Sequence, residues 1–126
     1  MAKTKKLHEG LVLSDLAVHG LIEKKGKDIV TLDLRNIRHA VTDYFVVCHG
    51  DSNTQVDALA DSVEYEIHKA TGENPWHREG KENSEWVILD YVHMVVHIFQ
   101  KDKREFYGIE SLWADAPMNK VAEGAV

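Results

Sequence analysis

The chain has 126 residues, of which 44% are hydrophobic and 29% are charged, and this length is typical of a single globular domain. Its 21 acidic and 15 basic residues give a formal net charge of -6, which would repel a phosphate backbone and argues against direct nucleic-acid readout. The lone cysteine, Cys48, excludes an internal disulfide and a zinc site made of four cysteines, and it favours a reducing, cytoplasmic compartment.

The start of the chain lacks the pattern of an export signal. Residues 1–6 are basic, but no apolar stretch of signal-peptide length follows them. No apolar run approaches the 18 or so residues that a membrane span requires. We therefore expect residues 1–10 to form a flexible N-terminus and the protein to stay out of membranes.

The first half of the chain predicts one helix and two strands. Apolar residues recur at helical spacing from Leu11, and Gly26 is a stop signal for this helix. Residues 28–34 are rich in branched side chains and predict a strand. Residues 42–49 are nearly continuous in strand formers, which is typical of a strand covered on both faces.

The second half predicts a longer alternation of elements. Residues 51–54 offer several capping side chains for a second helix, which Gly72 would end. The remaining predictions are an edge strand at 75–79, a polar turn at 81–84, a hairpin of strands 85–91 and 94–100, a helix at 101–112 and a flexible tail at 118–126. The order αββαβββα predicts an α/β fold over residues 11–117, a single-domain mixed sheet flanked by helices, with the strand order left open.

Two pairs of residues, one of two histidines and one of a cysteine and a histidine, are weak candidates for chemistry. His93 and His97 stand four residues apart on a predicted strand, which separates them by roughly 13 Å and is too far for one zinc ion. Cys48 and His49 are adjacent in a predicted strand, so their side chains point to opposite faces and cannot form a nucleophile and its base. The sequence predicts a packed thiol and no metal centre.

Polar motifs elsewhere also favour plain structural roles. The second predicted helix stacks three carboxylates and one imidazole along a flank that should face water, at Asp57, Asp61, Glu64 and His68. The glycines lack the spacing of a phosphate-binding loop. We therefore expect neither a cofactor nor a nucleotide.

The strand at 85–91 has an unusual face. Alternation places Trp86, Ile88 and Asp90 on one side, and Val87, Leu89 and Tyr91 on the other. A tryptophan beside a carboxylate favours a protein-binding surface, because aromatic residues anchor interfaces and nearby acids select a basic partner.

Several segments together resemble the Iojap family of ribosomal silencing factors, RsfS. The match runs in order from about residue 10 to residue 117, and its Thr-Asp-Tyr strand start and terminal Leu-Trp-Ala-Asp-Ala-Pro are specific. The segments that carry it are residues 28–34, 42–47, 85–91, 95–99, 104–107 and 112–117.

The resemblance implies a small α/β domain related to nucleotidyltransferases but lacking their catalytic site. It further implies a homodimer that binds ribosomal protein fourteen of the large subunit, sterically blocks joining of the small subunit and so represses translation. Carried onto this sequence, it predicts a partner-binding surface with Trp86 at its centre. The full set of expected contact residues is Trp86, Glu79, Glu82, Glu85, Asp90 and Tyr91.

An enzyme remains the alternative. Active nucleotidyltransferases have a Gly-Ser turn and an Asp-x-Asp pair that holds two metals, whereas this chain has an aspartate inserted between Gly50 and Ser52 and isolated aspartates at Asp33 and Asp90. A residual nucleotidyltransferase would have to use those two carboxylates. Within the family pattern, Val92-His93 replaces the usual Gly-Asp of the hairpin turn.

Overall fold

The computed structural model describes residues 2–80 and 82–121, with side chains described for 9–80 and 83–121. Its elements are α1 (Ala2–Glu23), β1 (Lys27–Asp33), β2 (Tyr44–Gly50), α2 (Asn53–Thr71), β3 (His77–Gly80), the 3₁₀ turn η1 (Glu82–Ser84), β4 (Trp86–Asp90), β5 (Met94–Gln100), α3 (Lys101–Tyr107), α4 (Ile109–Leu112) and β6 (Met118–Lys120). The strands form one sheet in the order β3-β4-β5-β2-β1-β6. Strands β2 and β5 run parallel, and the other neighbours are antiparallel.

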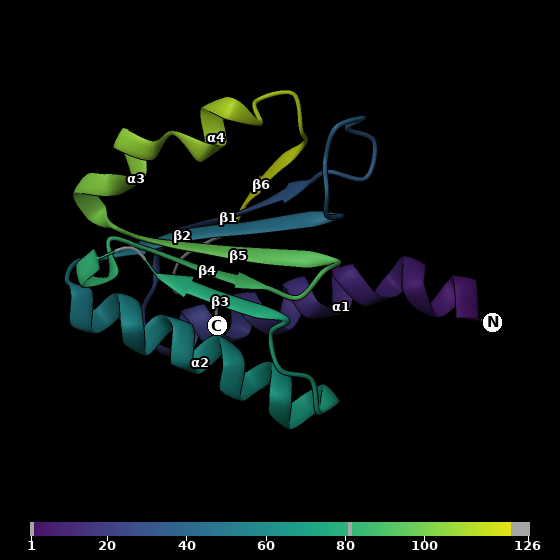
Figure 1. The fold of residues 1–126 in the computed structure, drawn as a ribbon, viewed down its shortest axis with the longest axis horizontal. Coiled ribbons are helices and arrows are strands. Elements are labelled where there is room, and N and C mark those ends of the chain that lie inside the picture. Colours follow the sequence, from purple (N-terminus) through teal and green to yellow (C-terminus); the bar gives the residue numbers. More distant parts are fainter. Residues whose placement is uncertain (1, 81, 122–126) are drawn as a thin grey trace.

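The sheet separates two layers of helix. Helices α1 and α2 lie on one face, and α3 and α4 lie on the other (Figure 1). The predicted mixed α/β architecture is confirmed, including the hairpin of β4 and β5 and the edge position of the strand after Pro75. No helix in the described part of the chain is both long and apolar enough to cross a membrane.

Three predictions about element boundaries are wrong. Helix α1 begins at Ala2, well before Leu11. Gly108 adopts a left-handed conformation with φ 61° and divides the expected helix at 101–112 into α3 and α4. Residues 118–120 form β6, which pairs with β1, because Val30, Leu32 and their neighbours leave an open sheet edge there. The rest of the expected tail, 122–126, lies outside the described residues.

One hydrophobic core fills the space between the sheet and the α1–α2 layer, which we call the helix face. Alternating residues of the central strands supply it, including Val46, Cys48 and Ile98, and none of these three has measurable exposure. The two helices approach closely at Gly20, where an added Cβ would lie 2.9 Å from the Ser62 carbonyl oxygen. Ser62 also donates a hydrogen bond to the Gly20 carbonyl at 2.7 Å, which fixes the crossing point.

The other face of the sheet is covered only in part. A second cluster of buried side chains joins β1, β2 and β5 to α4 through residues such as Leu32, Phe45, Phe99 and Ile109. Helix α3 contacts β2 and β5. By contrast, all four residues of β3 are exposed, so this face stays open over β3 and β4. We call that region the open face.

Candidate partner-binding site

Strand β4 carries the predicted alternation onto the open face. Trp86, Ile88 and Asp90 are partly exposed, while Val87 and Leu89 are buried toward α1 and α2. In the pairing of β3 with β4, Glu79 lies opposite Ile88 and therefore shares its face. The structure thus brings together three of the residues predicted from the sequence, Trp86, Glu79 and Asp90, on one open sheet surface.

Trp86 is held by other aromatic rings. Its indole stacks on Phe99 with ring centroids 5.1 Å apart and leans on Tyr107 at 4.7 Å. Its Nε1–H donates a hydrogen bond to Nδ1 of His97 at 3.1 Å. We call Trp86, His97, Phe99 and Tyr107 the aromatic cluster. The indole is therefore a partly buried ring with a fixed position, and it does not project freely into solvent.

His97 is the buried member of the aromatic cluster. The side chain contacts the edge of the Phe45 ring with centroids 4.5 Å apart, and the residue is 5% exposed. Burial lowers the pKa of His97 to about 4, so the imidazole is neutral near pH 7. Its Nε2 atom has no hydrogen-bond partner among the described residues.

Acidic side chains lie on or next to the open face, and one of them contacts the aromatic cluster. Glu85 accepts a hydrogen bond from the Tyr107 hydroxyl at 3.1 Å, and the Lys103 ammonium lies 3.9 Å from the same carboxylate. Glu79 is exposed, and its carboxylate lies 3.3 Å from Nε2 of His77. Asp90 accepts a hydrogen bond from the Val92 backbone N–H at 2.7 Å and so also holds the β4–β5 turn. The side chain of Glu82 lies outside the described part of the structure.

Tyr91 does not belong to this surface, contrary to the prediction. The residue is 4% exposed and packs in the core on the helix face. Burial raises the pKa of its hydroxyl, and the hydroxyl has no hydrogen-bond partner among the described residues. Strand alternation is the reason, because Tyr91 follows Asp90 and points the opposite way.

The predicted packing of Cys48 is confirmed, whereas His93 lies outside the strand on which it was predicted to accompany His97. Cys48 is fully buried and unbridged, and burial raises the pKa of its thiol to about 12. His49 points away from it toward Arg104, whose guanidinium lies 3.0 Å from His49 Nδ1. His93 lies in the turn before β5, near Glu9 and Asp43 at 3.6 Å each. Over the described residues, no cluster of three His, Cys, Asp or Glu side chains could hold a metal ion.

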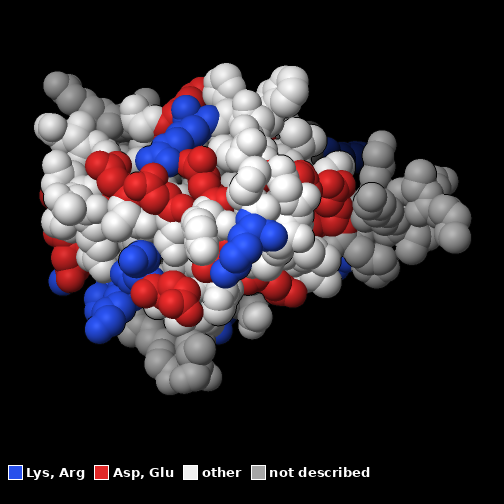
Figure 2. All heavy atoms as spheres, turned by 90° about the horizontal axis from the view of Figure 1, so that it is seen from below, with Lys and Arg blue, Asp and Glu red and all other residues white. Residues whose placement is uncertain are grey.

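The acidic flank of α2 faces water, as predicted, but its carboxylates have partners. Arg78 on β3 reaches over α2 and pairs with Asp61 at 3.0 Å and with Glu64. Asp57 accepts a short hydrogen bond from the Ser84 hydroxyl at 2.6 Å. The flank therefore fastens the edge of the sheet to α2. Acidic and basic side chains are interspersed over the helix side of the molecule (Figure 2).

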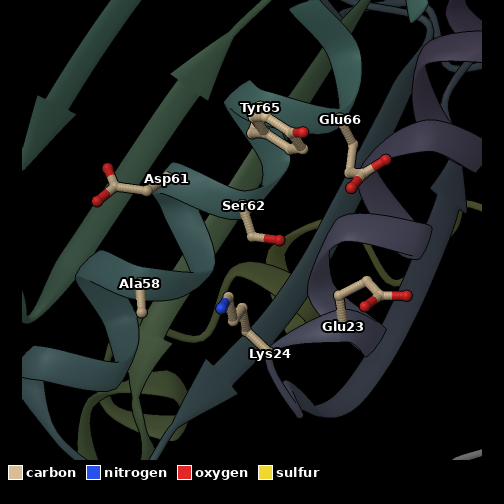
Figure 3. Close-up of a pocket in the computed structure, with 7 residues that line it drawn as sticks. All are labelled: Glu23, Lys24, Ala58, Asp61, Ser62, Tyr65 and Glu66. Carbon is tan, nitrogen blue, oxygen red and sulfur yellow. The ribbon is translucent and has the colours of Figure 1, made fainter. Parts of the chain in front are cut away.

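A groove of about 520 Å³ runs between the end of α1 and α2 (Figure 3). Two of its polar groups are engaged, since the Ser62 hydroxyl bonds to Gly20 and Glu66 lies 3.2 Å from Lys69 and 3.7 Å from His19. The groove is lined by Glu23, Lys24, Ala58, Asp61, Ser62, Tyr65 and Glu66. It lies on the α1–α2 side of the sheet, opposite Trp86.

The geometry speaks against the enzyme alternative. Asp33 and Asp90 lie on strands that β5 and β2 separate, which places them three strand spacings, or roughly 14 Å, apart. They also face opposite sides of the sheet, since Asp33 pairs with Tyr44 of the helix-face core. Two catalytic metals lie about 4 Å apart, so these carboxylates cannot share them. Asp33 is instead engaged by Arg35, which lowers the pKa of the carboxyl.

The turn between β2 and α2 is filled by this chain's own side chains. Ser52 caps α2 by accepting a hydrogen bond from the Gln55 N–H at 3.1 Å. The Gln55 side chain accepts from the Asp51 N–H at 2.7 Å and donates to the Lys25 carbonyl at 3.2 Å. The Asp51 N–H at this turn is thus already bonded to the Gln55 side chain.

Sequence reasoning did not assign Tyr107 or His97 to the site. Both lie within segments that carry the family resemblance, but their contact with Trp86 depends on register. Trp86 pairs with Phe99 across β4 and β5, which sets His97 on the adjacent diagonal, and α3 then folds Tyr107 back over Phe99. The alternation of β5 could have indicated His97; nothing local indicated Tyr107.

Comparison with known proteins agrees with the fold and the resemblance. The family model for RsfS, described as ribosomal silencing factor during starvation, matches residues 8–125. The ribosomal silencing factor of Halalkalibacterium halodurans is 38% identical over 105 residues, covering 83% of this chain and 88% of the relative. That of Bacillus subtilis is 40% identical over 96 residues, covering 76% and 80%.

A solved structure supports the same assignment. The crystal structure of a Chromobacterium violaceum protein matches with a TM-score of 0.77 and 35% identity, covering 92% of this chain and 96% of that one. Since the family model spans nearly the whole chain and the relatives exceed 30% identity over most of it, the chain belongs to the RsfS family of ribosomal silencing factors.

Proposed function

We propose that this protein represses translation by binding ribosomal protein fourteen of the large subunit and by blocking the approach of the small subunit. The observation that supports this most is the open face, an uncovered part of the sheet that a fixed tryptophan shares with carboxylates. Aromatic anchors surrounded by charged residues are typical of protein interfaces. The proposed mechanism needs bulk at the subunit interface and no catalysis, and it places the protein in the cytoplasm.

The chemistry of the open face indicates the kind of surface it would meet. Glu79, Glu85 and Asp90 supply negative charge, which suits a basic ribosomal protein and raises the rate of encounter. Ile88 and the partly exposed indole supply apolar area beside them. The expected contact is an apolar patch with a basic rim.

The central test is the affinity of a Trp86→Ala variant for isolated large subunits. Truncating an anchor tryptophan costs about 2 kcal/mol or more, which is a loss of affinity of about thirtyfold. Tyr65→Ala is a matched control, because Tyr65 is an aromatic residue that is 62% exposed on α2. Wild-type affinity in a folded Trp86→Ala variant would show that Trp86 only packs the sheet.

The steric part of the proposal has a separate test. Excess protein added to large subunits before small subunits should suppress joined ribosomes in a sucrose gradient, without added nucleotide. Trp86→Ala should restore joining. A requirement for nucleoside triphosphate turnover that disappears in Asp33→Ala or Asp90→Ala would instead support an enzyme.

We also propose that the free protein is a homodimer. Both sheet edges are short, with four residues in β3 and three in β6, so they offer little pairing surface. Apolar side chains are exposed near one end of the sheet, where Val41 is 91% and Val92 is 50% exposed and Thr42 bonds to the Val92 carbonyl. A second copy covering them would remove this area from water.

Light scattering tests the dimer. A dimer should give twice the chain mass of 14.3 kDa, and Val41→Glu should shift the mass toward that of one chain. A monomeric wild-type protein at micromolar concentration would contradict the dimer and leave the docking proposal intact.

A further inference from the structure

The aromatic cluster holds an indole hydrogen bond whose role goes beyond packing. An indole N–H can only donate, so the 3.1 Å contact makes Nδ1 of His97 the acceptor. A neutral imidazole that accepts at Nδ1 carries its proton at Nε2. That Nε2 atom is buried and has no partner among the described residues, so the ring satisfies Trp86 while one of its own polar groups goes unsatisfied.

His97 is placed to do this by the sheet. Trp86 lies opposite Phe99, and His97 is two residues away on the same face of β5. The imidazole is fixed in turn by the edge of Phe45 at 4.5 Å. The register of the two paired strands and the contact with Phe45 therefore position the imidazole that accepts the hydrogen bond.

We propose that His97 is a positioning residue that fixes the Trp86 indole for docking and directs its N–H inward, so that the partner meets the carbon part of the ring. This inference rests on the proposed docking function. It also specifies the partner: the group that contacts Trp86 is an apolar side chain, and no hydrogen-bond acceptor is required opposite the indole.

The geometry explains why an inward N–H favours such a partner. The ring is held on Phe99 and Tyr107 at 5.1 and 4.7 Å, with its polar atom against His97. A ring fixed before binding loses less conformational entropy when the partner arrives. A free indole would have to give up a hydrogen bond to water or find a new one in the interface.

The first test uses the free protein and nuclear magnetic resonance. The nitrogen spectrum of wild-type His97 should show a protonated Nε2 and an unprotonated Nδ1. The Trp86 indole proton, assigned by its loss in Trp86→Phe, should exchange with solvent more slowly than that of exposed Trp76, and His97→Phe should speed its exchange. A protonated Nδ1 in the folded protein would overturn the assignment.

The second test measures affinity for large subunits. His97→Phe keeps a ring but removes the acceptor, and should weaken binding about three- to tenfold, the factor that corresponds to one hydrogen bond. His97→Asn places an amide oxygen near the position of Nδ1 and should recover part of the affinity. In a Trp86→Phe background, His97→Phe should cause no further loss, because the coupled N–H is gone.

The outcomes separate the two proposals. If Trp86→Ala binds with wild-type affinity, the docking site itself fails and the role of His97 fails with it. If Trp86→Ala loses binding while folded His97→Phe and His97→Asn both bind as wild type does, only the positioning role is overturned. An equal loss from His97→Phe with and without the Trp86 indole would likewise show a general packing role.

Discussion

The two faces of the sheet differ in how they are closed. On the helix face, Cys48, Leu89 and Val96 have no measurable exposure beneath α1 and α2. On the open face, Trp86, Ile88 and Asp90 of β4 are only partly covered, and rings and charges replace aliphatic packing. Strand β4 thus contributes to stability through Val87 and Leu89, and to the proposed recognition through the residues that alternate with them.

The largest expected effect is the loss of stability when a side chain on the helix face is truncated, compared with one on the open face. Leu89→Ala removes a fully buried side chain from the helix face and should lower the free energy of unfolding by about 3 kcal/mol. Ile88→Ala, on the same strand but partly exposed, should cost clearly less. Urea denaturation of both variants measures the difference; equal losses would mean that the two faces contribute alike.

A pH titration should sharpen the contrast at His97. An unfolded histidine gains its proton below about pH 6.5, whereas burial holds the pKa of folded His97 at about 4. Stability should therefore be unaffected by this group above pH 6.5 and fall as the pH drops from 6.5 toward 4, by about 3 kcal/mol in total. The lowered pKa of His49 acts in the same direction.

The His97→Asn variant serves as the control for that titration, since it cannot gain this proton. The difference in unfolding free energy between wild type and variant should change with pH only between about 4 and 6.5. A difference that is constant over this range would contradict a buried neutral imidazole.

The turn between β4 and β5 offers a smaller, stabilising change. Val92 has φ 75°, a left-handed conformation that a β-branched residue adopts only at a cost of about 1–2 kcal/mol. Val92→Gly should therefore raise the free energy of unfolding by about 1 kcal/mol, after the greater flexibility of glycine in the unfolded chain is counted. Val41→Gly should bring no such gain, because the φ of Val41 is not positive.

The smallest expected effect concerns charge on the open face. Glu79→Lys should slow association with large subunits, and the wild-type rate should fall as salt rises, since screening acts within about 8 Å at physiological salt. Asp15→Lys makes the same charge change on exposed α1 and should slow association less. Equal rates for the two variants would remove local steering from the proposal.

Local sequence patterns predicted most of the fold. Alternation in 85–91 placed Trp86 and Leu89 on opposite faces, and the capping residues before Asn53 and Gly72 after Thr71 bounded α2 correctly. These features depend on neighbours within a few residues. Gly108 was missed as a break because a single glycine is compatible with a continuous helix pattern.

Contacts between distant segments explain the other differences. Strand β6 exists because β1 presents an edge to it, and its three exposed residues carry no strand pattern of their own. Arg78 reaches Asp61 and Glu64 only after β3 is laid beside α2. The bond from Trp86 to His97 likewise requires the register of β4 on β5.

The parallel pairing of β2 with β5 has a consequence for synthesis of the chain. Tyr44 lies opposite Met94, so the central strand leaves the ribosome long before its partner. Until β5 arrives, the apolar edge of β2 is unpaired in the nascent chain, and pairings so distant in sequence form slowly. We therefore expect early packing of α1 and α2 against β2 to limit aggregation of the growing chain.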